Sequence, residues 1–145
     1  MKTDFSLYIA SAVATISMMG SLYFSEIMKV PACPLCWYQR IFMYPLVGIL
    51  AVGILRKEKR VDFYVLPFSI AGFLVALYHS LLYYKIIPEE TTVCTNGISC
   101  ATKLVEWFGF ISIPLLSLAS FAAIIVCMVI YRWGYFLKRF AKRYL

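Results

Sequence analysis

Four of the five cysteines in this 145-residue sequence occur as two spaced pairs. Cys33 and Cys36 form a CxxC motif, whereas Cys94 and Cys100 enclose five residues. A CxxC motif can close a small, strained disulfide ring. When its second cysteine falls in the first turn of a helix, unpaired amide groups and the helix dipole favour the reactive thiolate. The two pairs therefore indicate redox chemistry at sulfur.

The residues alone leave two other roles open for these four thiols. They could supply four sulfur ligands to a structural zinc ion, although zinc ribbons usually have two tight CxxC motifs. They could also form two purely structural disulfides, but closing the loop between Cys94 and Cys100 would contribute only about 2.4 kcal/mol. We favour a relay in which one pair exchanges with the other. Cys127 is interpreted as a small buried apolar residue.

Three further side chains are expected near the CxxC motif. Arg40 follows Cys36 by one helical turn, and a guanidinium group in an apolar segment is costly enough to suggest a function. It would stabilise a thiolate or hold a carbonyl oxygen of an electron acceptor, unless it only extends to the membrane interface. His79 is suited to proton transfer during quinone reduction, and a buried structural histidine is the alternative. Tyr38 adds a flat aromatic surface near the motif. The alternative is that it belongs to the aromatic belt at the membrane interface.

The elements that must position these residues are membrane-spanning helices. Hydrophobic residues make up 63% of the chain and charged residues 14%, which excludes an ordinary soluble domain. Four continuous apolar runs are each long enough to cross a bilayer. They cover residues 5–28, 37–55, 63–84 and 110–131. Continuous rather than alternating apolarity favours helices over barrel strands. We therefore expect an all-α, four-helix transmembrane bundle, with residues 1–145 as a single membrane domain.

The charges predict the orientation of this bundle. Ten of the 14 Lys and Arg residues lie in three places: the N-terminus, the connection after the second run, and the C-terminus. By the positive-inside rule, both termini and that connection are cytoplasmic. The two loops with cysteine pairs then lie on the extracytoplasmic side of the cell membrane, where disulfides persist. The net charge of +7 accordingly predicts contact with anionic lipid of the bilayer, not nucleic acid.

The motifs together resemble one known family. The string Cys33-Pro-Leu-Cys36-Trp-Tyr-Gln-Arg40 begins the second run, and Gly109-Phe-Ile-Ser-Ile-Pro114 follows the second cysteine pair. This pattern resembles the DsbB family of disulfide bond formation proteins, especially its compact BdbC-type members from Gram-positive bacteria. The resemblance covers essentially the whole chain. The spacing of Cys94 and Cys100 is closer than in the Gram-negative branch.

The resemblance implies a quinone-dependent thiol oxidase that supports disulfide formation in exported proteins. Such a protein reoxidises a DsbA-like (BdbD-like) partner with a thioredoxin fold and passes the electrons to the membrane quinone pool. Cys94 would be the cysteine that the partner attacks, and Cys100 its disulfide mate. The Gram-positive character favours menaquinone over ubiquinone. The alternative is a four-span scaffold or small transporter subunit with structural cysteines or a zinc site.

The resemblance also implies the quinone site. Cys33 and Cys36 would form the pair next to the quinone, with the Cys36 thiolate in contact with it and Arg40 polarising its ring. His79 would lie close to the quinone. Tyr38 is counted among the expected quinone-binding residues for its aromatic surface and not because of the resemblance. No resident metal is expected. Residues 103–108 resemble a membrane-surface helix that precedes the last span in this family.

Overall fold

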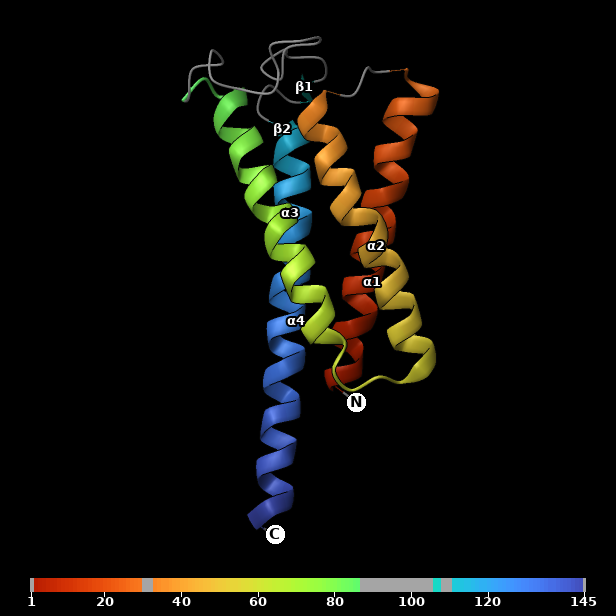
Figure 1. Ribbon diagram of the computed structural model, residues 1–145, viewed down its shortest axis with the longest axis vertical. Coiled ribbons are helices and arrows are strands. Elements are labelled where there is room, and N and C mark those ends of the chain that lie inside the picture. Colours follow the sequence, from red (N-terminus) through yellow and green to blue (C-terminus); the bar gives the residue numbers. More distant parts are fainter. Residues whose placement is uncertain (1, 30–32, 87–105, 108–110, 145) are drawn as a thin grey trace.

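The computed structural model describes residues 2–29, 33–86, 106–107 and 111–144 (Figure 1). Its helices are α1 (Lys2–Leu22), which continues as the π-helix η1 (Tyr23–Ile27), α2 (Pro34–Arg56), α3 (Val61–Tyr83) and α4 (Ile113–Tyr144). Four helical segments are long and apolar enough to cross a membrane. The predicted all-α, four-span architecture is confirmed.

The predicted spans agree with the helices to within a few residues, except at the C-terminus. The last apolar run was expected to end at residue 131, but α4 continues to Tyr144. The extension contains several Lys and Arg residues, which are good helix formers although they are not apolar. Hydropathy therefore predicts only the part of α4 that fits a bilayer.

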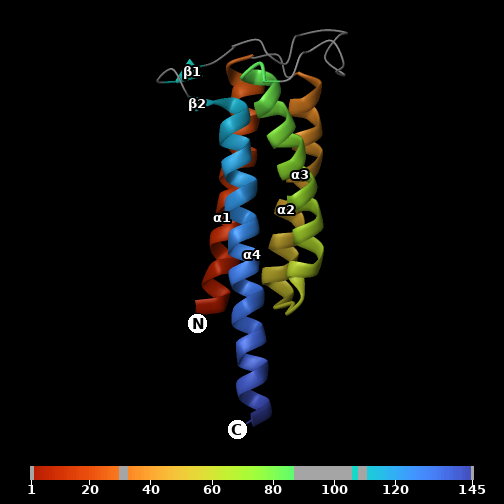
Figure 2. The same cartoon turned by 90° about the vertical axis from the view of Figure 1, so that its left-hand side faces the viewer.

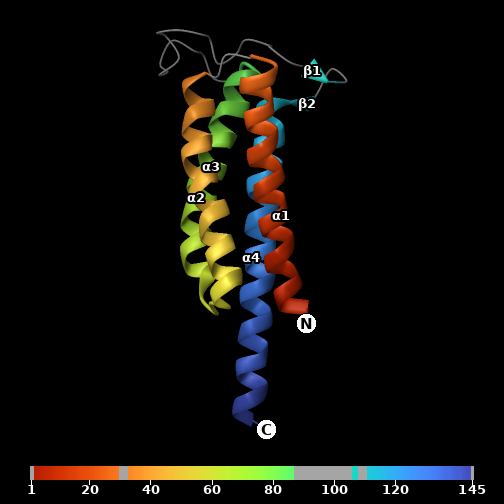
Figure 3. The same ribbon diagram turned by 90° about the vertical axis from the view of Figure 1, so that its right-hand side faces the viewer.

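The four helices form a closed bundle. Helix α1 packs against α2 and α4, and α3 packs against the same two helices. Figures 2 and 3 show α4 beside α1 and extending beyond the other helices toward the C-terminus. Both chain ends and the α2–α3 connection lie at one end of the bundle, and the start of α2 lies at the other (Figure 1). This grouping agrees with the predicted topology, whereas the side of the membrane stays a prediction.

The core is built from large apolar side chains of all four helices. The most completely buried include Leu46 and Leu50 of α2, and Phe121 and Ile124 of α4. A close approach between α3 and α4 depends on Gly72, because a Cβ atom there would overlap the Phe121 ring. The opposite faces of the helices also carry many exposed large apolar residues, as expected for surfaces in contact with lipid.

Hydroxyl groups add polar links between α1 and α4. The Ser17 hydroxyl donates to Ser120 Oγ at 2.8 Å, and the Ser6 hydroxyl donates to the carbonyl oxygen of Cys127 at 3.1 Å. Hydrogen bonds of this kind join helices within a membrane, where hydrophobic attraction between helices is absent. Cys127 is partly buried and packs against the main core, which agrees with its interpretation as a packing residue.

Two short strands precede α4. β1 (Glu106–Trp107) pairs antiparallel with β2 (Ile111–Ser112). The expected membrane-surface helix over residues 103–108 is wrong at Glu106 and Trp107, the two of those residues that the structure describes. Their backbone is extended because it forms a ladder with the residues just before α4, and such pairing depends on a partner segment as well as on local sequence.

Candidate functional site

The CxxC motif sits at the start of α2. Cys33 precedes the helix with an extended backbone (φ −66°, ψ 162°), and Pro34 occupies its first turn. Proline suits this position because its φ is already helical and the missing N–H has no partner in the first turn. Cys36 therefore lies within the first turn. The two cysteines are free thiols whose Sγ atoms are 3.0 Å apart and share a hydrogen bond.

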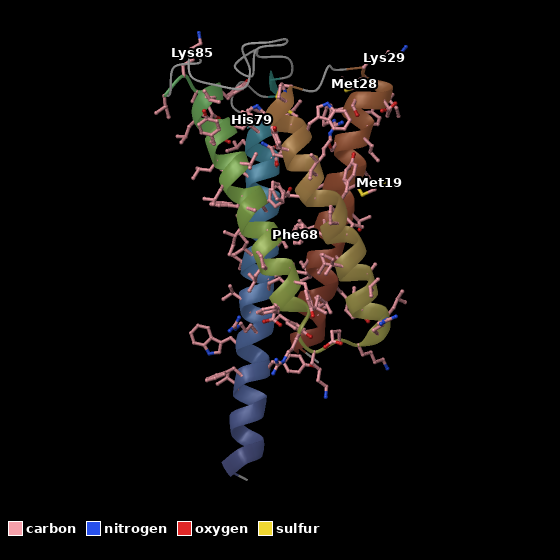
Figure 4. The ribbon with its side chains drawn as sticks, viewed as in Figure 1. Met19, Met28, Lys29, Phe68, His79 and Lys85 are labelled. Atoms are coloured by element: carbon pink, nitrogen blue, oxygen red, sulfur yellow. The ribbon has the colours of Figure 1, made fainter. Side chains whose placement is uncertain are left out.

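Helix α3 brings His79 to this pair. Figure 4 shows His79 on the last turns of α3, near the start of α2. Its Nε2 atom is 3.6 Å from Cys33 Sγ, and the side chain is only 2% exposed. The two sulfurs and the imidazole nitrogen all lie within 4.8 Å of one another. The structure thus brings together three of the predicted site residues from two helices.

Gln39 completes the cluster and was missed by the sequence analysis. Its Nε2 atom lies 3.0 Å from His79 Nδ1, and Gln39 is buried. With the amide nitrogen facing Nδ1, that ring nitrogen accepts, and Nε2 carries the hydrogen that faces Cys33. The signal in the sequence was the one amide side chain of the 37–55 run, about one turn after Cys36 and next to Arg40.

Hydrogen bonding favours a thiolate at Cys33. The hydrogen bond with the Cys36 thiol is the main reason that the pKa of Cys33 lies well below its usual range. His79 adds to this effect through its own hydrogen bond, while burial opposes it. In the reduced pair Cys33 is therefore the favoured thiolate. The expectation that Cys36 contacts the quinone as a thiolate concerns a bound state and stays a prediction.

The surroundings of the pair are apolar. Cys33 and Leu35 of α2 form a buried cluster with Leu82 of α3, and Cys36 and Tyr78 pack against it. Such packing lowers the local dielectric and strengthens the electrostatic interactions between the sulfurs. The pair consequently sits in an apolar environment at one end of the bundle, with Cys33 buried and Cys36 partly exposed.

Arg40 connects α2 to α1 beside the site. Its Nε–H donates to Ser21 Oγ at 2.9 Å, and its Nη2–H donates to the Ser21 carbonyl oxygen at 3.1 Å. The guanidinium also stacks on Trp37, 5.5 Å from the ring centroid. Arg40 thus does more than extend to the membrane interface: it fixes one helix against another. Ser21 gave no recognisable signal in the sequence because serines recur throughout this span.

The remaining predicted residues are less closely associated with the cluster. Tyr38 is 46% exposed on the outer face of α2, unlike the buried Gln39 next to it. A contact of Tyr38 with a quinone stays a prediction. Cys94 and Cys100 lie outside the residues that the structure describes, so their pairing and their approach to Cys33 and Cys36 stay predictions as well.

Known proteins share this sequence over most of its length. The family model for disulfide bond formation protein DsbB matches residues 3–131. Disulfide bond formation protein C of Bacillus subtilis (strain 168) is 46% identical over 124 residues, which are 84% of this chain and 88% of that protein. Probable disulfide formation protein C 2 of Bacillus anthracis is 44% identical over 127 residues, or 87% and 89% of the two chains.

A third relative, the SPbeta prophage-derived disulfide bond formation protein B of Bacillus subtilis (strain 168), is 45% identical over 107 residues, covering 73% of this chain and 71% of that protein. No solved structure matches the chain significantly. The family match reaches all four apolar helices, which are those of a multi-pass membrane protein. The chain therefore belongs to the DsbB family of disulfide bond formation proteins.

Proposed function

We propose that this protein is a membrane thiol oxidase that reoxidises a DsbA-like (BdbD-like) thioredoxin-fold partner and passes the electrons to a membrane quinone. The observation that carries the proposal is the cluster of Cys33, Cys36 and His79, held together by Gln39 at one end of an apolar bundle. Membership of a disulfide-forming family supports this thiol chemistry and weighs against the four-span scaffold.

The residues around the pair suit a quinone. Arg40 uses Nε and Nη2 to hold Ser21, and among the described residues its Nη1 has no hydrogen-bond partner. Nη1 is therefore available to donate to a carbonyl oxygen. Trp37 is 57% exposed and presents an aromatic surface beside Arg40. When bound, a quinone supplies an acceptor for two electrons and two protons. We favour menaquinone, as the compact Gram-positive sequence type suggests.

The proposed reaction begins with thiol–disulfide exchange. A thiolate of the reduced partner attacks Cys94 of the Cys94–Cys100 disulfide, which releases the Cys100 thiolate and forms a mixed disulfide. The second thiol of the partner then displaces Cys94, so that the partner leaves oxidised and the loop pair is reduced. The loop thiols next reduce the Cys33–Cys36 disulfide by the same chemistry. Each exchange breaks one S–S bond and forms another.

The residues of the cluster then prepare the reduced pair to give up two electrons and two protons. The His79 Nε2–H faces Cys33 and can donate to its thiolate, while Gln39 keeps the imidazole in that orientation. Arg40 is placed to bind an oxygen that gains negative charge. The apolar packing of Leu35 and Leu82 shields the buried Cys33 from water. Oxidation restores the Cys33–Cys36 disulfide.

Quinol formation tests this function directly. The purified protein in detergent is mixed with a reduced thioredoxin-fold partner and a quinone, and quinol is followed by absorbance. We expect turnover by the natural protein, none by Cys33→Ser or Cys36→Ser, and nearly normal turnover by Cys127→Ala, whose cysteine packs away from the cluster. If the natural protein yields no quinol, or if Cys36→Ser still turns over, the proposal fails and the scaffold becomes the better interpretation.

A further inference from the structure

Three metal ligands converge at the start of α2. The sulfur atoms of Cys33 and Cys36 and an imidazole nitrogen of His79 lie within 4.8 Å of one another. Among the residues that the structure describes, no other group of three Cys, His, Asp or Glu side chains is gathered in this way. Two thiolates and an imidazole are ligands that Zn²⁺ and similar thiophilic cations prefer.

The distance between Cys33 and His79 matches that in a tetrahedral zinc site, whereas the distance between the two sulfurs is shorter than such a site requires. With Zn–S bonds of about 2.3 Å and Zn–N bonds of about 2.05 Å, ligand atoms lie about 3.6 Å apart for S···N and about 3.8 Å for S···S. The Cys33 Sγ to His79 Nε2 distance is 3.6 Å. The two sulfurs are 3.0 Å apart and must separate by about 0.8 Å. A rotation of the Cys36 side chain, which is only partly buried, would provide this separation.

Gln39 supplies the outer support that a metal-binding histidine needs. A histidine bound through Nε2 carries its hydrogen on Nδ1 and donates it to a neighbouring acceptor. Gln39 lies 3.0 Å from Nδ1 through its amide nitrogen, and a half-turn of the amide would bring its Oε1 to the same place. An amide can therefore support the imidazole with and without a metal, which a leucine side chain could not do.

Charge also favours a divalent cation at this position. Binding of one M²⁺ to the two thiols releases two protons and gives a centre with two thiolates, one neutral imidazole and no net charge. A neutral centre is compatible with the apolar packing of Leu35 and Leu82, whereas an isolated buried dication would be strongly disfavoured. The fourth tetrahedral position is left for a water molecule.

We propose that the reduced protein binds one thiophilic divalent cation, such as Zn²⁺, through Cys33, Cys36 and His79, and that the bound cation blocks turnover. Both sulfur lone pairs used in oxidation are then held by the metal, so the pair cannot re-form its disulfide. This inhibition rests on the proposed function, whereas binding of the cation does not. The site differs from a four-cysteine zinc site because it needs neither Cys94 nor Cys100.

Cobalt provides a spectroscopic test of binding. The full-length protein with Cys94→Ser and Cys100→Ser is reduced in detergent, freed of reductant and titrated with Co²⁺ alone, and thiolate-to-cobalt charge-transfer absorption is recorded. We expect one Co²⁺ per chain, displacement by Zn²⁺, and no binding by the oxidised form. Adding Cys33→Ser or Cys36→Ser should abolish the band, and His79→Gln should weaken binding at least tenfold.

Two variants separate the metal site from a general loss of structure. Gln39→Leu should weaken Co²⁺ binding about 10- to 100-fold, whereas Gln39→Glu, which keeps an acceptor for the Nδ1 hydrogen, should retain it. Cys127→Ala is the matched control and should bind as the parent does. Circular dichroism confirms that each variant is folded. Unchanged charge-transfer absorption in Cys33→Ser or His79→Gln, or no absorption in the parent, would overturn the site.

Inhibition is measured separately with the natural protein. Zn²⁺ added to the quinol assay should stop turnover, and a chelator should restore it. Continued turnover while the site is saturated with Zn²⁺ would refute the inhibition but leave the binding site standing. If no quinol forms even without metal, while Co²⁺ still binds as described, the proposed function fails and the metal site does not.

Discussion

Gln39 supports the redox cluster, although nothing in the sequence analysis had singled it out. It lies on α2 and reaches His79 on α3, so a single hydrogen bond joins the two helices that carry the cluster. Both side chains are buried, and a buried polar group without a partner costs about 1–3 kcal/mol. The pair therefore stabilises the bundle and also orients the imidazole toward Cys33.

Replacing Gln39 tests its effect on the redox step. In Gln39→Leu the Nδ1 atom of His79 loses its partner, and we expect about a tenfold lower rate of quinol formation, equivalent to about 1.4 kcal/mol. Gln39→Glu can only accept a hydrogen bond, which favours a hydrogen on Nδ1 in place of the one on Nε2 that faces Cys33, so it should not restore this rate. Thermal unfolding in detergent shows whether the fold is intact. Equal rates for Gln39→Leu and the natural protein would show that the orientation of His79 does not matter.

Arg40 combines two roles that substitution can separate. It holds Ser21 of α1 through two hydrogen bonds, and we propose that its Nη1 binds a quinone oxygen. We expect Arg40→Ala to raise the quinone KM at least tenfold while exchange with the thioredoxin-fold partner is largely kept. Ser21→Ala removes only the hydrogen bond from Nε and should leave the KM within about twofold, because the hydrogen bond from Nη2 to the backbone carbonyl oxygen is kept.

The comparison of these two variants is decisive for Arg40. Steady-state quinol formation at several quinone concentrations gives the KM, and alkylation of the reduced partner gives the exchange rate. An unchanged KM in Arg40→Ala would reject a role in quinone binding. A rise of the same size in Ser21→Ala would instead show that Arg40 acts only by fixing α1 against α2.

The residue-level predictions from sequence succeeded where a residue's chemistry is unusual for its setting. Cysteines at CxxC spacing, an arginine one turn later and a histidine inside an apolar run are each conspicuous, and the structure places Cys33, Cys36 and His79 together. Gln39 and Ser21 were missed because their importance depends on which helix faces them. That information is tertiary, and the spacing along one helix does not contain it.

At the scale of elements, hydropathy predicted the four helices well and their continuations poorly. Apolar runs identify the parts that cross a bilayer, but α4 continues to Tyr144 through a segment whose many Lys and Arg residues are good helix formers. The final turns of the first span form the π-helix Tyr23–Ile27, and β1 pairs with β2 before α4. These local departures depend on the pattern of backbone hydrogen bonds. The hydropathy of a segment does not predict that pattern.

Packing between α3 and α4 depends on Gly72. A side chain at this position would overlap the ring of Phe121, one of the largest fully buried residues. We expect Gly72→Ala to destabilise the bundle by about 1–3 kcal/mol because overpacking forces the ring from its position. Phe121→Leu combined with Gly72→Ala should recover part of the loss. Thermal unfolding in detergent measures both effects.

Gly48 of α2 is the matched control for this substitution. A Cβ atom there would meet nothing within 4 Å, so Gly48→Ala should leave stability unchanged or raise it by up to about 1 kcal/mol through better helix propensity. Similar losses in both alanine variants would mean that glycine flexibility, and not the space occupied by Phe121, explains the requirement.

At the scale of the whole molecule, the segments rich in Lys and Arg lie together at one end of the bundle. The two chain ends and the connection from Lys57 to Arg60 lie at one end of the bundle (Figure 1). The redox cluster lies near the other end, where Figure 4 shows Met28, Lys29 and Lys85. In the basic end, Tyr131 donates to the Glu58 carbonyl oxygen at 3.3 Å, and Arg132 lies 3.7 Å from Asp62. The excess of basic residues is thus concentrated at the end of the bundle that lies away from the redox cluster.

Labelling in intact cells tests which end faces outward. A variant without the five native cysteines receives a single new one, either Met28→Cys near the redox cluster or Lys59→Cys in the basic connection. By the positive-inside rule, a membrane-impermeant maleimide should label Met28→Cys in intact cells and Lys59→Cys only after permeabilisation. Equal labelling of both after permeabilisation is the control for reactivity. Labelling of Lys59→Cys alone in intact cells would show that the topology is the reverse of the one predicted. The redox cluster would then lie on the reducing side, where its disulfide would not persist.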